Sequence, residues 1–315
     1  MNRIDVHQHI VPPFYAQAMP AHGGDPSGSR TPDWTARRAI DFMDAHAITA
    51  AVLSVSTPGV AGWDGEDRRA MARRINEYTA KVVADRPDRF GNFATLPLPD
   101  LDGALAELDH ALDSLDADGV VLLADYEGRY LGDPVFQTLW AELDRRAAVV
   151  FIHPGATPHQ PVLPGVDGLA GPLVDFPFET TRTAVQLVLN GTLDRYPNVR
   201  VILSHAGGFV PYAAERFAGL ARVFRPEAPD PDHVLAAFKR FYFDTALSSG
   251  TAIPSLKSFA GADRILFGTD FPYAREDIAG FFTDTLDADD TLTMSERSAV
   301  AGENAARLFP RWAAS

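Results

Sequence analysis

Ile4-Asp5-Val6-His7-Gln8-His9, near the start of the chain, is a short apolar segment that ends in two histidines separated by one residue. Side chains alternate between the two faces of a β-strand, so in a strand His7 and His9 would point to one side and Gln8 to the other. Two imidazoles on one side of a strand provide half of a metal site. A coincidental pair near a flexible terminus is the alternative, and the rest of the chain must decide between the two.

Apolar runs of strand length recur along the chain and alternate with segments that have the apolar period of helices. This alternation is typical of βα units around a parallel sheet. Eight such runs match the strand number of a (β/α)8 or TIM barrel, and we expect that α/β fold. The strands are expected at residues 3–6, 50–56, 91–96, 119–124, 148–153, 199–204, 241–244 and 264–267.

The amphipathic segments between the strands predict helices around the outside of the barrel. After the last strand, Thr293 precedes a helical pattern with Glu296 three residues later, which is the signature of a capping box. The expected helices span residues 35–46, 66–85, 101–115, 134–146, 178–193, 210–221, 254–259, 278–286 and 295–309.

The composition, with 46% hydrophobic and 22% charged residues, is that of an ordinary globular protein. A chain of 315 residues is long for one domain, but barrels of this type reach that size undivided, so we expect residues 1–315 to form a single domain. The chain contains no cysteine, and any metal must therefore be held by nitrogen and oxygen atoms.

The net charge of −14 at pH 7 opposes binding to phosphate backbones, so nucleic acid is not an expected partner. Met1-Asn2-Arg3 leads directly into the first strand without an apolar signal segment, and no later apolar run is long enough to span a bilayer. We therefore expect a cytoplasmic enzyme that does not bind membranes.

Two segments rich in glycine and proline follow strands one and five, at residues 12–33 and 154–175. Loops that follow barrel strands lie at the end where active sites are built, and long loops there often cover the site. We expect lid insertions at both places. His22 and His159 within them could contact substrate, or they are ordinary surface histidines.

The partners that the His7/His9 pair requires are found at the ends of three other strands. His153 ends the fifth strand, His205 follows the sixth, and Asp270 follows the eighth, which neighbours the first strand in a closed barrel. Each one alone has a structural explanation, such as a hydrogen-bonded histidine or an N-cap aspartate. Their joint occurrence at one end of the barrel predicts a metal site.

At these residues the chain resembles the metal-dependent amidohydrolase superfamily and, within it, the aminocarboxymuconate-semialdehyde decarboxylase-like (amidohydrolase-related) branch. The resemblance rests on residues 4–9, 151–154, 203–208 and 267–272 and spans nearly the whole chain. It implies a distorted eight-stranded barrel with one divalent metal ion, for which zinc is the first expectation and manganese the second. His7, His9, His153 and Asp270 match its ligand positions, and His205 matches its catalytic histidine.

The resemblance has further implications for the number of metal ions and for substrate binding. Binuclear members carry a bridging lysine at the end of the fourth strand, and residues 119–126 contain none. Arg216 matches an arginine that reaches the substrate of a neighbouring subunit, which implies a homodimer; an ordinary surface arginine is the alternative. A second substrate arginine is expected near Arg37 and Arg38, but neither can be placed in register.

Three neutral imidazoles and one carboxylate leave a bound divalent ion with positive charge and open positions, which suit an anionic substrate or a water molecule. We expect non-oxidative decarboxylation of a small aromatic or unsaturated carboxylic acid, of salicylate or muconate type. The proton would come through His205 and a metal-bound water or through Asp270, and Arg216 would bind the acid.

Other functions use the same residues. A mononuclear hydrolase of a lactone or an amide, with Asp270 taking up the proton, is the main alternative, and a hydratase is a smaller one. A metal-stabilised binding protein would not require His205 or two long loops.

Several other residues have less certain roles. Asp244 at the end of strand seven could orient a ligand histidine or equally bond nearby backbone, and Gln8 is expected to support the site or to pack. Three further histidines are expected to be solvated, and several aromatic side chains could stack on a planar substrate or belong to the core. These are His46, His110 and His233, and Phe14, Trp34, Trp63, Phe176 and Tyr273.

Overall fold

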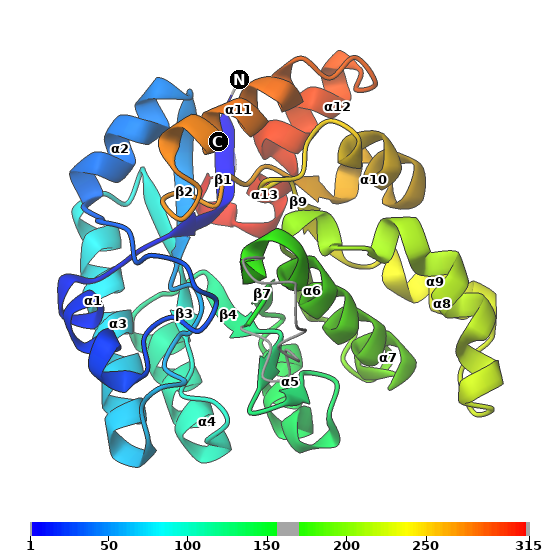
Figure 1. The fold of residues 1–315 in the computed structure, drawn as a ribbon, viewed down its shortest axis with the longest axis horizontal. Helices are drawn as coiled ribbons and strands as arrows, with labels where there is room; N and C mark the ends of the chain where they lie inside the picture. The colour runs from blue at the N-terminus through cyan, green and yellow to red at the C-terminus, as the bar shows by residue number, and fades with distance from the viewer. Residues whose placement is uncertain (1, 156–169, 313–315) are drawn as a thin grey trace.

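The computed structural model describes residues 2–155 and 170–312. Eight parallel strands surround a common axis and helices cover their outside, so the predicted (β/α)8 barrel is confirmed (Figure 1). The strands follow one another in the order β1 (Arg3–His9), β2 (Ile48–Ser54), β3 (Phe90–Thr95), β4 (Gly119–Leu123), β7 (Val149–His153), β8 (Arg200–Leu203), β9 (Tyr242–Asp244) and β10 (Ile265–Leu266).

The first and last strands lie side by side and bring the two ends of the sheet together. The amide of Val6 donates a hydrogen bond of 2.9 Å to the carbonyl of Phe267, and the amide of Asp270 donates one of 2.8 Å to the carbonyl of His7. The barrel is uneven because β9 has three residues and β10 only two. Asp270 is thereby held beside the histidines of β1, as the neighbouring positions of strands one and eight predicted.

Helices cover the strands at nearly all the predicted places. The capping box at Thr293 and Glu296 is present. Two of the described helices were not predicted: α1, in the first expected lid segment, and α9, which begins after Asp230 with its carboxylate accepting a hydrogen bond from the His233 amide. The helices are α1 (Pro13–Ala18), α2 (Ala36–Ala45), α3 (Gly65–Asp85), α4 (Leu101–Asp109), α5 (Gln137–Arg145), α6 (Gly171–Leu189), α7 (Thr192–Arg195), α8 (Val210–Phe224), α9 (Pro231–Phe238), α10 (Ala252–Ala260), α11 (Glu276–Asp287), α12 (Met294–Ser298) and α13 (Asn304–Leu308).

Short elements complete the fold. A small antiparallel hairpin follows β4, and single turns of 3-10 or π-helix extend or precede several helices. These are β5 (Asp125–Tyr126), β6 (Arg129–Tyr130), η1 (Met19–His22), η2 (His110–Ser114), η3 (Pro134–Phe136), η4 (His205–Gly207), η5 (Ala262–Arg264), η6 (Ala299–Glu303) and η7 (Pro310–Trp312).

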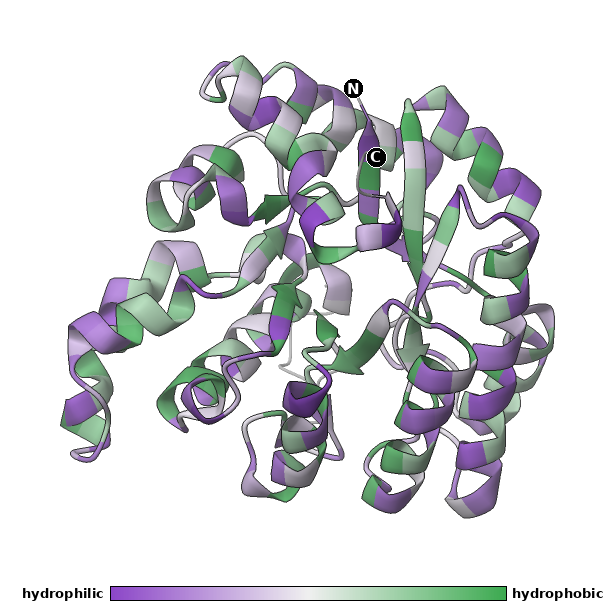
Figure 2. Cartoon of the chain, turned by 180° about the vertical axis from the view of Figure 1, so that it is seen from behind, coloured by the Kyte–Doolittle hydropathy of each residue, from purple (hydrophilic) through white to green (hydrophobic). Residues whose placement is uncertain are grey.

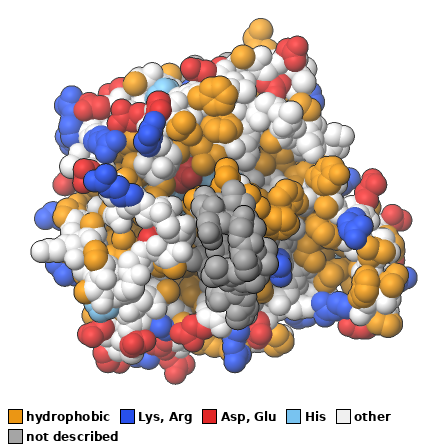
Figure 3. All heavy atoms as spheres, in the orientation of Figure 1, with side chains coloured by type: hydrophobic (Ala, Val, Ile, Leu, Met, Phe, Trp, Pro, Cys, Tyr) orange, Lys and Arg blue, Asp and Glu red, His pale blue; other side chains and the backbone are white. Residues whose placement is uncertain are grey.

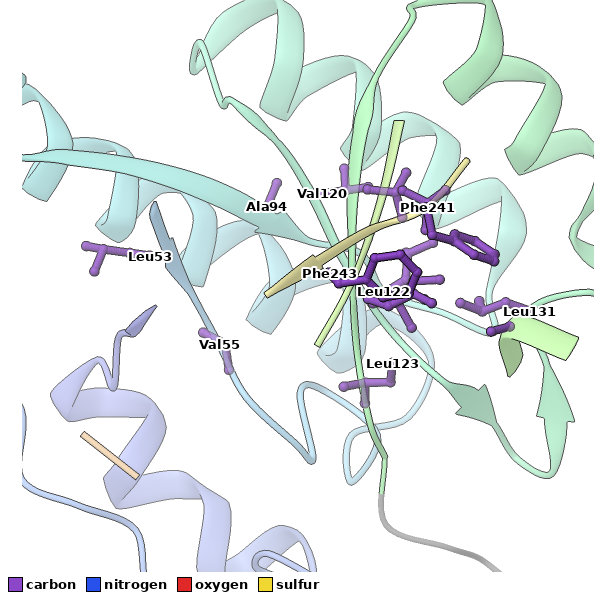
Figure 4. Close-up of a cluster of buried hydrophobic side chains, with 14 of the residues drawn as sticks. Leu53, Val55, Ala94, Val120, Leu122, Leu123, Leu131, Phe241 and Phe243 are labelled. Atoms are coloured by element: carbon purple, nitrogen blue, oxygen red, sulfur yellow. The ribbon is translucent and has the colours of Figure 1, made fainter. Parts of the chain in front are cut away.

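Two hydrophobic clusters hold the layers together. The larger one fills the space between the strands and the helices, and Figure 4 shows part of it around Leu53, Val120 and Leu122. The smaller one fills the barrel interior and includes Phe151 and, from α13, Leu308. Figure 2 shows the consequence for hydropathy: the strands are mostly hydrophobic, whereas the outer helices carry both hydrophobic and hydrophilic residues.

The first strand changes its facing before it reaches the two histidines. Ile4 and Val6 belong to the interior cluster, so strict alternation would turn Gln8 inward and His7 outward. The pairing of β1 with β2 is irregular between Asp5 and Gln8, and an irregularity of this kind re-aims the side chains that follow it. His7 therefore lies inside the barrel, with its ring centroid 4.8 Å from that of Phe151.

The two predicted lid segments contain more regular structure than expected. Residues 12–33 include α1 and η1. The prediction of a loop up to residue 175 is wrong at its end, because α6 begins at Gly171 with Pro172 in its first turn, where proline is well tolerated. Residues 156–169, with His159, lie outside the described residues, and the role of both segments as lids stays a prediction. Among the helices of residues 2–155 and 170–312, none is both long and apolar enough to span a membrane.

Candidate metal centre

The four predicted ligands meet at the carboxyl end of the barrel. His7 and His9 come from β1, His153 ends β7, and Asp270 follows β10; all four side chains are buried. One ligand atom from each lies within 4.8 Å of the ligand atoms of the other three. The sequence prediction that these side chains come together is therefore confirmed.

The spacing of the donor atoms suits a single ion. The Nε2 atoms of His7 and His9 are 3.1 Å apart, and Oδ1 of Asp270 lies 3.0 Å from Nε2 of His9 and 3.5 Å from Nε2 of His7. Ligand atoms bound to one zinc ion at about 2.1 Å would be separated by roughly 3.0–3.4 Å. The ligand atom of His153 lies within 4.8 Å of these three atoms, so three nitrogens and one oxygen surround a space that one divalent metal ion can occupy.

The outer nitrogen of each ligand histidine is already bound to the protein. Nδ1 of His7 lies 2.8 Å from Oδ2 of Asp244, Nδ1 of His9 lies 3.2 Å from the carbonyl of Ser54, and Nδ1 of His153 lies 2.9 Å from the carbonyl of Pro154. An acceptor at Nδ1 places the proton there and leaves the Nε2 lone pair free toward the centre. This arrangement is the one that metal-binding imidazoles require.

His205 lies beside the four ligands without belonging to their cluster. Its ring centroid is 4.9 Å from that of His7 and 5.9 Å from that of His153. Nδ1 donates to the carbonyl of Ala246 at 3.2 Å, so Nε2 of the neutral ring carries the lone pair. Burial is the main reason that the pKa of His205 is lowered, which keeps the imidazole neutral.

Two functional candidates adopt unusual backbone conformations. Asp270 has φ of 64° and His205 has φ of 51°, and Ala206 after it has φ of 57°. Non-glycine residues rarely occupy this left-handed region, and they persist there only where the surrounding structure fixes them. The Asp270 amide donates a hydrogen bond to the His7 carbonyl, and the His205 amide donates a hydrogen bond of 2.9 Å to Oδ1 of Asp244.

Asp244 connects the ligands to His205, as one reading of the sequence predicted. Its Oδ2 lies within hydrogen-bond distance of the His7 ring. Its Oδ1 accepts hydrogen bonds from the amides of His205 and Ala246, at 2.9 and 3.0 Å. Burial opposes a charged His7, but Asp244 and Asp270 outweigh it and raise the pKa of His7 to about 10 in the absence of a metal ion. A metal ion must displace this proton before His7 can bind it.

Sequence reasoning missed Asp5. This buried carboxylate accepts hydrogen bonds from the amides of His7 and Thr269, at 3.0 and 3.1 Å, and a third from the Thr269 hydroxyl, at 2.6 Å. It therefore joins β1 to the segment that carries Asp270. Gln8 donates to Asp5 at 3.1 Å, which confirms the expectation that Gln8 supports the site. The position of Asp5 two residues before His7 was the only signal available in the sequence.

The remaining candidates divide between the site and the surface. Tyr273 and Phe176 form part of the wall, with ring centroids 5.4 Å from His9 and 5.9 Å from His153. His22 stacks on Trp63, with centroids 4.4 Å apart. His46 and His110 are half-buried rather than fully solvated, since His46 lies against Phe42 and His110 near Glu77; His233 is exposed.

The predicted substrate arginines lie on the surface of this chain. Arg37 is bound to Asp41 at 2.9 Å, and Arg38 is bound to Glu276 at 3.1 Å. Both guanidinium groups pair with carboxylates of this chain, and neither residue belongs to the four-ligand cluster. Arg216 is exposed on α8 and is not part of the four-ligand cluster.

We expect the substitution Asp244→Asn to weaken metal binding about 10- to 100-fold, the usual cost of losing a partner of a ligand histidine. The amide retains the size of the side chain but removes the negative charge that supports His7. A competition titration with a chelating dye measures the change. Asp263→Asn, at an exposed carboxylate just before β10, is the control, and equal affinities in the two variants would contradict the role of Asp244.

Comparisons with known proteins agree with this geometry. The family model described as "Amidohydrolase" matches residues 4–311. Decarboxylase yanB of Aspergillus niger is 39% identical over 326 residues, which cover 99% of this chain and 88% of that protein. The 6-methylsalicylic acid decarboxylase of Penicillium expansum is 38% identical over 317 residues, covering 99% of this chain and 97% of that protein.

A solved structure adds a metal and an aromatic ligand. The dihydroxybenzoic acid decarboxylase of Polaromonas sp. JS666, with bound manganese and the inhibitor 2-nitroresorcinol, superposes with a TM-score of 0.81 at 26% identity and covers 98% of this chain and 97% of that chain. The match over nearly the whole sequence and the four-residue cluster lead to one assignment. The chain belongs to the amidohydrolase family, in the branch that contains these decarboxylases.

Proposed function

We propose that this protein is a divalent-metal-dependent, non-oxidative decarboxylase of a small aromatic carboxylic acid with a hydroxyl group beside the carboxylate. The observation that carries the proposal is the complete cluster of His7, His9, His153 and Asp270, with His205 next to it, in a chain whose relatives decarboxylate hydroxylated benzoic acids. A muconate-type acid has less support, because the two proteins named above whose names give a substrate act on aromatic acids.

In this proposal His7, His9, His153 and Asp270 hold one divalent ion. When bound, the ion supplies positive charge that attracts the carboxylate and the adjacent hydroxyl oxygen of the substrate. Zinc and manganese both suit three imidazoles and a carboxylate. Zinc was the first choice from sequence, and manganese has the support of the Polaromonas enzyme. Elemental analysis of the purified protein distinguishes the two.

The reaction requires a proton at the ring carbon that bears the carboxylate. Protonation there allows the carbon–carbon bond to break, with its electron pair returning to the ring and carbon dioxide leaving. Two side chains are placed to move the proton: His205, which is neutral with a free Nε2, and Asp270, whose carboxylate faces the same space as the ligand histidines. Tyr273 and Phe176 supply aromatic walls for the ring of the substrate.

The test is incubation of metal-loaded protein with salicylate-type acids, muconate-type acids, lactones and amides. Release of carbon dioxide from a hydroxybenzoate, with the corresponding phenol as the second product, supports the proposal. Hydrolysis of a lactone or an amide without carbon dioxide release would overturn it in favour of the mononuclear hydrolase, which uses the same residues.

We also propose that the protein is a homodimer joined through α6 and α8. Large hydrophobic side chains are exposed on both helices, and Figure 3 shows them gathered on that part of the surface. A groove of about 720 Å³ lies between the two helices. Contiguous apolar surface of this kind marks interaction sites. The exposed side chains are Leu173, Val174, Phe178, Tyr212, Val223 and Phe224.

Arg216 lies on α8 among these side chains, so a partner placed on this face would receive it. In the proposed dimer each Arg216 binds the substrate carboxylate in the other subunit through charge-assisted hydrogen bonds. Residues 1–315 would act as one domain, since β1 and α13, from opposite ends of the chain, pack together. A cytoplasmic location stays part of the proposal and is tested by cell fractionation.

We expect the double variant Tyr212→Asp/Phe224→Asp to be monomeric and to lose most of its activity, because two carboxylates oppose burial of the face and Arg216 no longer reaches a second site. Size-exclusion chromatography with light scattering measures the mass. Phe281→Asp, at another exposed phenylalanine, on α11, is the matched control. If the unsubstituted protein were itself a fully active monomer, both the proposed dimer and the proposed role of Arg216 would be wrong.

A further inference from the structure

Three arginines line one pocket of about 170 Å³ at the end of the barrel opposite to the metal centre. Arg200 is the first residue of β8, Arg240 lies two residues before β9, and Arg264 directly precedes β10. Parallel neighbouring strands begin at the same end of the barrel, which is why the three side chains converge. We propose that this pocket is a binding site for a small oxyanion, such as phosphate or another compact multivalent anion.

Most of the hydrogen-bond donors in the pocket are not used by the protein. A guanidinium group has five N–H donors. Within the described residues, Arg200 donates one short bond, of 2.6 Å to the carbonyl of Ala147. Arg240 donates bonds of 3.4 and 3.5 Å to Asp194 and Pro197, and Arg264 donates one of 3.5 Å to the Arg240 carbonyl. Bonds this long are weak, so donors remain for a ligand.

The charge in the pocket is not balanced by its own lining, which contains no carboxylate among the described residues. The nearest carboxylates are those of Asp194, 3.4 Å from Arg240, and Asp263, 3.8 Å from Arg264. Both are partly exposed, and Asp194 also binds His233 at 2.8 Å. In a chain with a net charge of −14, three convergent guanidinium groups form a local positive site that an anion would neutralise.

The shape of the pocket limits the ligand. The pocket volume of about 170 Å³ suits a compact anion such as phosphate or sulfate. The Arg264 guanidinium lies over the ring of Tyr242, 4.8 Å from its centroid, and this contact holds one wall in place. The small volume and the three guanidinium groups together favour a compact, multivalent anion.

Binding there should stabilise the weakest part of the barrel. β9 and β10 are its shortest strands, and an anion bound to three arginines would connect the beginnings of β8, β9 and β10. The same strands lead to His205, Asp244 and Asp270 at their other ends. The inference does not depend on the proposed decarboxylation, since it concerns the opposite end of the barrel.

The test is thermal unfolding of the metal-loaded protein in sodium phosphate and in sodium chloride at equal ionic strength. We expect a saturable rise of Tm in phosphate, because a ligand that binds only the folded state stabilises it. Arg240→Gln and Arg264→Gln should each weaken the apparent affinity about tenfold or more, the cost of a lost charge-assisted hydrogen bond. Arg37→Gln, at an arginine exposed on α2, should leave the affinity unchanged.

Two further measurements keep the result interpretable. Arg264→Lys retains the positive charge, so it should unfold at the original Tm in chloride but bind phosphate more weakly, because lysine lacks the planar fork of donors. A phosphate effect that persists in Arg240→Gln/Arg264→Gln would place the anion at the metal centre or elsewhere and overturn the proposal. The absence of any saturable phosphate effect in the unsubstituted protein would overturn it as well.

Discussion

The substitution His153→Ala is expected to leave a folded protein that no longer retains a stoichiometric metal ion and no longer turns over substrate. His153 lies between the other ligands, with its ring centroid 5.3 Å from that of His7 and 5.0 Å from that of His9. Its loss leaves two imidazoles and one carboxylate, which is an incomplete site for zinc or manganese. We expect a fall in metal affinity of more than about 100-fold, beyond the usual effect of losing an outer partner.

Metal content after dialysis, measured by elemental analysis, and circular dichroism at the same concentration check the result together. His233→Ala is the matched control, because His233 is exposed on α9, outside the four-ligand cluster, and its ring is bound to Asp194. If His153→Ala retained one metal ion per chain with normal activity, the assignment of all four ligands would fail, since they were assigned as one set.

The sequence was sufficient to predict where the barrel strands lie, because each strand is a short apolar run followed by a polar turn. It was also sufficient to predict that His7, His9, His153 and Asp270 meet, because strands of a parallel barrel end on the same face. It was not sufficient to predict how His7 enters the barrel. Alternation continued from Ile4 and Val6 would have turned it outward, and only the irregular pairing between Asp5 and Gln8 reverses this.

The support around the site was also only partly predictable. A carboxylate at the end of β9 suggested a partner for one histidine, but nothing in the sequence indicated that Asp244 also binds the amide of His205. Such contacts depend on a backbone in the left-handed region at His205, which residue type does not reveal. The loop predicted at residues 171–175 was wrong for a similar reason. Gly171 and Pro172 indicated a loop, but glycine and proline also occur where a helix begins.

Arg216 illustrates a different limit. Its side chain is exposed in a single chain, and no property of that chain distinguishes an arginine that enters a neighbouring active site from one that is merely solvated. The exposed apolar side chains of α6 and α8 are the physical signal for a partner, and they become visible only when two helices distant in sequence are placed side by side. The second substrate arginine stays unassigned because neither Arg37 nor Arg38 can be placed in register, and here they pair with Asp41 and Glu276.

The second large effect is expected for His205→Ala, which should retain the metal ion but lose about 10²- to 10⁴-fold in kcat, the range that a proton-transferring side chain supplies. His205 is outside the four-ligand cluster, so its loss does not open the site. Its neutral ring, with Nδ1 donating to Ala246, offers Nε2 for proton transfer, and substrate binding should change little. Steady-state kinetics with metal analysis of the same samples therefore separate a fall in kcat from a rise in KM.

The size of the loss also identifies the proton carrier. If His205 moves the proton, kcat should fall by the full 10²- to 10⁴-fold while the metal content stays at that of the unsubstituted protein. A loss smaller than about tenfold would favour Asp270 as the proton carrier, because its carboxylate also faces the ligand histidines. Loss of metal together with activity would instead make His205 a fifth ligand. Each result corresponds to a different geometry around Nε2 of His205, so one variant with two measurements distinguishes them.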